Sequence, residues 1–118
     1  MDYVKIQKKF PLAFAELIKW RPQLEIRDGK LGCLLQPSPV HAHIWWWDNF
    51  NDRDLYDFFD KHEFEIAMIP YYDMKLNKAS SFCSTIGGSG VGEYKTRTKA
   101  ETEAYMKAFS LFEEKLKK

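Results

Sequence analysis

The chain has 118 residues, of which 45% are hydrophobic and 30% are charged, while 6 are glycine and 5 are proline. This composition excludes a disordered, collagen-like or disulfide-scaffold protein, and the length fits a single domain over residues 1–118. The net charge of +1 provides no overall attraction to nucleic acid or to anionic lipid. The unusual component is the aromatic content of 16%.

The first predicted element covers residues 3–20, which have a helical composition interrupted by Pro11. Proline removes a backbone donor inside a helix but suits the first helical turn. We therefore expect two short helices or one kinked helix, ended by Arg21 and Pro22. The side chains expected to face inward are Phe14, Leu17, Ile18 and Trp20.

Three strands are predicted next. Residues 24–27 and 31–35 flank Asp28-Gly29, a pair that favours a tight hairpin because both turn residues must adopt positive φ. After a loop at 36–39, the segment Val40–Trp47 is dense in β-branched and aromatic residues and predicts the third strand.

A helix over Arg53–Lys61 is predicted from its periodicity, with Asn51 or Asp52 as its N-cap. Its expected inward face comprises Leu55, Phe58, Phe59 and His62. The segment Phe64–Ile69 then predicts a strand that Pro70 stops.

The C-terminal part begins with a polar connection at Tyr71–Lys78 and a strand at Ser81–Ile86, with Phe82 and Ile86 expected inward. The glycine run 87–92 predicts a loop, and residues 93–96 a short extended piece.

The last predicted element is a helix that opens with a capping box between Thr98 and Glu101. Its expected packed face comprises Ala104, Tyr105, Ala108, Phe109, Leu111, Phe112 and Leu116. On the other face, the i,i+4 pair Glu113–Lys117 is expected to lie in solvent. The order α-β-β-β-α-β-β-α predicts one α+β domain with a mostly antiparallel sheet of about four to five strands packed against helices.

The glycine run has the spacing of a phosphate-binding loop, but Glu93 and Tyr94 stand where that motif requires lysine and then serine or threonine. A carboxylate at the lysine position repels phosphate. We therefore expect neither a nucleotide nor any other cofactor.

Two histidines, His41 and His43, lie at i,i+2 in the third strand, so their side chains share one face and can reach the same metal ion. The site could be completed by His62, Asp48 or Cys83. The alternative is that the histidines are ordinary surface or packed residues, because a short motif of this kind is weak evidence alone.

Trp45 and Trp47 share the face of those histidines, while Trp46 lies opposite. If Trp46 points into the core, either a helix covers Trp45 and Trp47 or the protein presents them to a partner. Exposed tryptophan and tyrosine clusters mark contact sites, so the contact surface is predicted on the aromatic strand, and the predicted partner-binding residues are Trp45, Trp47, Tyr71 and Tyr72.

Residues 31–70, which contain the three consecutive tryptophans, carry a net charge of −5, which argues against nucleic-acid binding. No nucleophile stands beside a base, so no residue is predicted to be catalytic. No apolar stretch suits a signal peptide or a membrane span, and Cys33 and Cys83 are expected to be buried thiols, which together favour a cytoplasmic protein.

Two segments, Arg53–Asp60 and Glu93–Glu101 with the following Ala108-Phe109, resemble small uncharacterised proteins of phages, prophages and gut-bacterial genomes. The resemblance implies an accessory protein of mobile-element origin and supplies no active site. Our first hypothesis is therefore a non-enzymatic accessory or protein-interaction module that contacts a protein partner or a second copy through the aromatic strand. The alternative is a small metal-binding protein or hydrolase that uses His41 and His43.

Overall fold

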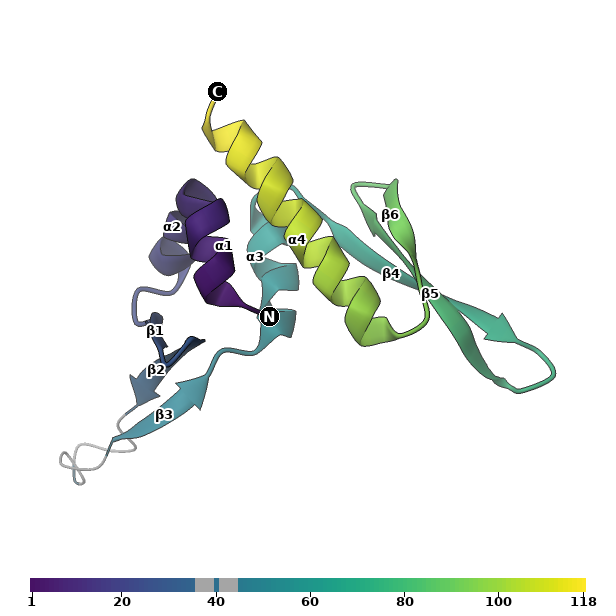
Figure 1. Cartoon of the computed structure of the whole chain (residues 1–118), viewed down its shortest axis with the longest axis horizontal. Helices are drawn as coiled ribbons and strands as arrows, with labels where there is room; N and C mark the ends of the chain where they lie inside the picture. Colours follow the sequence, from purple (N-terminus) through teal and green to yellow (C-terminus); the bar gives the residue numbers. More distant parts are fainter. Residues whose placement is uncertain (36–39, 41–44) are drawn as a thin grey trace.

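The computed structural model describes residues 1–35, 40 and 45–118 and confirms the α+β class (Figure 1). In chain order its elements are α1 (Tyr3–Lys9), α2 (Pro11–Trp20), β1 (Glu25–Arg27), β2 (Lys30–Leu35), β3 (Trp46–Asn49), the 3-10 helix η2 (Asp52–Asp54), α3 (Leu55–Lys61), β4 (Ile66–Asp73), β5 (Lys78–Ile86), β6 (Ser89–Tyr94) and α4 (Arg97–Leu116).

The described strands form two antiparallel sheets, β1-β2-β3 and β4-β5-β6, in place of one larger sheet. Helix α4 crosses the centre of the molecule and packs against α2 on one side and against β5 and β6 on the other (Figure 1). The β2–β3 and β4–β5 hairpins project toward opposite ends. The radius of gyration is therefore 16.9 Å, compared with about 13–14 Å for a compact chain of this length.

The N-terminal predictions are confirmed. Helix α1 ends before Phe10, and Pro11 occupies the first position of α2, where its missing N–H group costs no helical hydrogen bond. The turn between β1 and β2 has positive φ at Asp28 (50°) and Gly29 (79°), as the predicted two-residue hairpin requires.

An aromatic cluster between α2, α3 and α4 forms the centre of the core. Phe58 is fully buried, and its neighbours surround it with ring-centroid distances of 5.0–6.5 Å. They are Trp20, Phe59, His62, Phe109 and Phe112. The N-cap is Asn51, whose Oδ1 accepts the backbone N–H of Arg53 at 3.1 Å and starts η2 directly before α3. The prediction for this helix is therefore confirmed at its cap and its face.

His62 ends α3 and packs its ring against Phe58 and Phe112, with centroid distances of 5.0 and 4.5 Å. Burial of the imidazole is the main cause that lowers the pKa of His62 below its usual 6.5; among nearby charges, Glu16 opposes this shift and Lys61 adds to it, as does Lys115. The folded state therefore favours the neutral imidazole.

We expect the free energy of unfolding to fall as the pH drops from 7.5 through 6.5, because the unfolded chain takes up a proton at His62 that the folded chain resists. The loss should level off once the pH lies below the lowered pKa, where both states are protonated. His62→Phe, which keeps an aromatic ring, should show a smaller decline between pH 7.5 and 5.5 in urea unfolding. Equal declines in the two proteins would rule out this role for His62.

The prediction that Pro70 stops its strand is wrong, because β4 continues to Asp73 and the hairpin turn is confined to residues 74–77. Strand β4 lies at the edge of its sheet. Proline is tolerated there because its nitrogen can point away from the neighbouring strand. In β5, Ile86 is buried as predicted and Phe82 is half-buried, while Ser84, which lies between them on the same face, is fully buried.

The prediction that the glycine run is a loop is also wrong for most of its length. Gly87 and Gly88 form the turn with φ of 58° and 86°, and Ser89–Tyr94 forms β6. Glycines weaken an isolated strand, but here β6 pairs with β5 and is covered by α4.

The predicted capping box of the last helix is corrected by two residues. The N-cap is Thr96, whose Oγ1 accepts the backbone N–H of Lys99 at 3.2 Å, and Thr98 lies within the first turn. Glu101 is buried in the core, where its carboxylate accepts hydrogen bonds from the hydroxyls of Tyr56 and Tyr105. Glu113, predicted to pair with Lys117 in solvent, is also buried, because the start of α2 packs against it.

Candidate functional site

The predicted tryptophan surface lies at the start of β3. Trp45 and Trp46 are 55% and 45% exposed, so Trp46 does not point into the core. Trp47 is half-buried: its indole N–H donates to Asn49 Oδ1 at 2.8 Å, and the Arg27 guanidinium lies 5.5 Å from its ring centroid. Of the three consecutive tryptophans, Trp45, directly before β3, and Trp46, its first residue, are therefore exposed.

The predicted tyrosines lie on a different element. Tyr71 and Tyr72 are exposed on β4, in a hairpin that extends beyond the N-terminal end of α4 (Figure 1). We call residues 69–80 the arm, and its five exposed apolar side chains the arm surface. They are Ile69, Tyr71, Tyr72, Met74 and Leu76, with Tyr72 66%, Met74 90% and Leu76 60% exposed.

The predicted partner-binding residues lie in two separate parts of the fold. The tryptophans of β3 and the arm lie at opposite ends of the molecule's longest axis, which measures 55 Å (Figure 1). No pattern in the sequence marks Ile69, Met74 or Leu76 as contact residues. The one indication in the sequence is that these apolar residues stand in or beside a segment that is otherwise polar and rich in turn-forming residues.

The arm has a well-defined local structure. Asp73 Oδ1 accepts the backbone N–H of Lys75 at 2.9 Å and so fixes the turn. The Ser80 hydroxyl donates to the Tyr71 carbonyl at 3.1 Å, across a register shift between Tyr71 and Tyr72. These bonds hold the backbone while leaving the apolar side chains in solvent.

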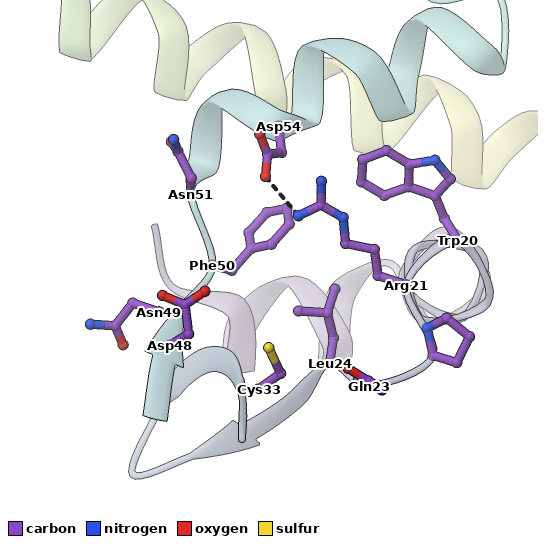
Figure 2. Close-up of a pocket in the computed structure, with 11 residues that line it drawn as sticks. Trp20, Arg21, Gln23, Leu24, Cys33, Asp48, Asn49, Phe50, Asn51 and Asp54 are labelled. Carbon is purple, nitrogen blue, oxygen red and sulfur yellow. Dashed lines mark hydrogen bonds and ion pairs between the residues drawn. The ribbon is translucent and has the colours of Figure 1, made fainter. Parts of the chain in front are cut away.

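A cleft of about 500 Å³ lies between the end of α2, the β2–β3 hairpin and η2 (Figure 2). Arg21 extends across it, with its guanidinium 4.6 Å from the Trp20 ring centroid and 5.6 Å from that of Phe50. Its Nη1 forms an ion pair of 2.6 Å with Asp54 Oδ2. Sequence analysis treated Arg21 only as a helix terminus, and the cleft depends on contacts that no local pattern indicates.

A second polar cluster surrounds the buried Glu101. Its Oε2 accepts hydrogen bonds from the hydroxyls of Tyr56 (2.9 Å) and Tyr105 (3.3 Å), while Oε1 lies 3.6 Å from Arg53 and from Arg97. Burial and, after it, the Glu101 hydrogen bond raise the pKa of Tyr56 to about 12, and burial raises that of Tyr105. Both phenols thus stay protonated at neutral pH, where they act as structural donors.

The predicted metal ligands His41 and His43 lie outside the described residues, so this hypothesis stays a prediction. In the described part of the chain, no group of three histidine, cysteine or acidic side chains could hold a metal ion. Of the proposed additional ligands, His62 packs within the aromatic cluster. Cys33 and Cys83 are half-buried free thiols.

Comparisons with protein-family models, with curated proteins and with solved structures found no match to this chain. Among the described residues, no helix combines the length and apolar character needed to cross a membrane.

Proposed function

We propose that the chain is a protein-interaction module that self-associates through its arm. The observation that carries this proposal is the arm surface, in which five large apolar side chains are exposed on one projecting hairpin. Contiguous exposed apolar side chains mark interaction sites, and tyrosine provides a large contact area with little loss of conformational freedom. Methionine adapts its shape to a partner for the same reason that it fills irregular cores.

A second copy is the occupant that the charges of the arm favour. The arm carries Asp73 beside the exposed Lys75 and Lys78. In an arrangement with twofold symmetry, two antiparallel arms can place the carboxylate of each near the lysines of the other. The net charge of +1 produces little repulsion between copies.

The contact is expected to use side chains and not the addition of a strand to the edge of the sheet. β4 is an edge strand, but it contains Pro70, which has no N–H group to donate to a partner strand. Pairing along the open edge of β4 would therefore be interrupted at its centre, whereas the faces of the two arms can pack without such an interruption.

We expect the Met74→Gln/Leu76→Gln double variant to weaken self-association by about tenfold or more, because buried apolar anchors dominate interface energies. Both side chains lie in solvent in the single chain, so the fold should be retained. Sedimentation velocity over a range of protein concentrations measures the dissociation constant, and circular dichroism checks the fold. A wild-type chain that stays monomeric at about 100 µM, far above a micromolar dissociation constant, would overturn the proposal.

Two control variants locate the contact. Leu12→Gln changes an exposed leucine on α2, away from the arm, and should leave the dissociation constant unchanged. Trp45→Ala tests the tryptophan surface at the opposite end of the molecule. If Trp45→Ala dissociates the assembly and the arm variant does not, the contact lies at the tryptophans around the start of β3.

A further inference from the structure

We infer that the cleft beside α2 is a binding site for the cationic side chain, guanidinium or ammonium, of a basic peptide. Its elements are two aromatic rings, two carboxylates and an open volume of about 500 Å³ (Figure 2). This site is separate from the arm, so it can be tested whether or not the chain self-associates.

The cleft already holds a cation of the chain itself. The Arg21 guanidinium lies between the rings of Trp20 and Phe50 and pairs with Asp54 at 2.6 Å (Figure 2). Aromatic faces attract cations through their quadrupole, and a carboxylate completes the recognition of a guanidinium. The geometry that binds Arg21 is therefore the geometry that would bind a guanidinium from another chain.

Arg21 can be exchanged for a cation of another chain. Its side chain is about half exposed, and an incoming guanidinium would replace the two ring contacts and the Asp54 ion pair that Arg21 loses on leaving the cleft. Its backbone is held separately, because its N–H group donates to the Leu17 carbonyl at the end of α2. Displacement therefore requires rotation of one side chain and no rearrangement of the fold.

The charges lining the cleft favour a cation over an anion. Asp48 and Asp54 both line it, against the single positive charge of Arg21. Asp54 is paired with Arg21, whereas Asp48 forms no ion pair with any residue that the structure describes. A second cation entering the cleft thus meets, in Asp48, a carboxylate that no described cation pairs with, while a phosphate or carboxylate ligand would meet two like charges. The surrounding segment 31–70 adds to this preference with its net charge of −5.

The test uses the full chain and short synthetic peptides in low salt. The probe is acetyl-Gly-Arg-Gly-amide, and its matched control carries citrulline, which has the shape of arginine without the charge. We expect saturable shifts of the Trp20 indole N–H resonance and of the amides at residues 48–51, with a dissociation constant of about 1 mM for a ligand of this size. The lysine peptide should bind the same site, and 0.5 M salt should weaken both, since the Debye length falls to about 4 Å.

Variants distinguish this proposal from a merely structural cleft. Arg21→Gln removes the internal competitor and should tighten binding about two- to fivefold, the worth of one cation–π contact. Asp48→Asn, on the exposed rim, should weaken peptide binding by a similar factor. Asp48 takes no part in the Arg21–Asp54 ion pair, so this variant leaves that ion pair intact. Asp57→Asn, an exposed aspartate on α3 outside the cleft, should leave binding unchanged.

Several results would overturn the inference: equal binding of the citrulline peptide, shifts confined to residues outside the cleft, or weaker binding by Arg21→Gln. The last would mean that Arg21 itself contacts the ligand. Tighter binding of free spermidine than of the arginine and lysine peptides would show that the site takes a free polyamine and not a peptide side chain.

Discussion

Phe58→Ala should lower the free energy of unfolding by about 3–5 kcal/mol, the range for removal of a buried aromatic side chain. Phe58 is fully buried and contacts rings from α2, α3 and α4, so its removal opens a cavity where three helices meet. Rigid neighbouring rings fill such a cavity poorly. Because a domain has about 5–15 kcal/mol of stability in total, this single substitution should remove a large share of the free energy of unfolding. Denaturant unfolding monitored by circular dichroism measures the loss.

A matched aromatic truncation at the surface provides the control. Tyr72→Ala removes a ring that is largely exposed on the arm, and at a protein concentration at which the chain is monomeric we expect its free energy of unfolding to stay within about 0.5 kcal/mol of the wild-type value. Phe58→Leu, which retains most of the apolar volume, should fall between the two. If Phe58→Ala is no more destabilising than Tyr72→Ala, the aromatic cluster is not the centre of the core.

Local chemistry predicts the elements of this fold where one residue or a short pattern determines the backbone. Pro11 separates α1 from α2, Asp28-Gly29 forms its turn, and Asn51 caps the helical segment before α3. In each case the interaction that determines the backbone involves residues within a few positions of one another. A short sequence pattern therefore includes every residue that takes part in the interaction.

The predictions fail where the determining contact is long-range. Pro70 is compatible with a strand only because β4 lies at an edge, and the position of a strand in its sheet is not a local property. The spacing of Thr98 and Glu101 favours a capping box, but Glu101 instead accepts a hydrogen bond from Tyr56 of α3, 45 residues away, and Thr96 is the N-cap.

The candidate binding surfaces likewise divide into features that local sequence predicts and features that depend on long-range contacts. Exposure of Tyr71 and Tyr72 follows from the composition around them, but their separation from Trp45 follows from the partition of strands into two sheets. The cleft at Arg21 requires α2, the β2–β3 hairpin and η2 to meet, which no spacing in the sequence specifies. Sequence patterns thus identify exposed aromatic residues more readily than the sites that tertiary contacts assemble.

Glu113→Ala should lower the free energy of unfolding by about 2–4 kcal/mol, because two backbone donors would lose a charged acceptor. Glu113 Oε1 and Oε2 accept the N–H groups of Leu12 (3.0 Å) and Ala13 (2.8 Å) in the first turn of α2. The N-cap residue of α2, Phe10, has no side-chain acceptor, so α4 supplies the cap from 100 residues away in the chain. The carboxylate also interacts favourably with the positive end of the α2 dipole.

The adjacent Glu114 makes the test specific to this long-range cap. Glu114→Ala removes an exposed carboxylate from the same helical turn and should change the free energy of unfolding by less than about 0.5 kcal/mol. Glu113→Gln keeps one acceptor oxygen but no charge and should cost about half as much as Glu113→Ala. Hydrogen exchange adds a local measurement, since the amides of Leu12 and Ala13 should exchange faster in Glu113→Ala even when global unfolding is taken into account. Unchanged exchange at these two amides would mean that α2 does not depend on α4 for its N-terminal cap.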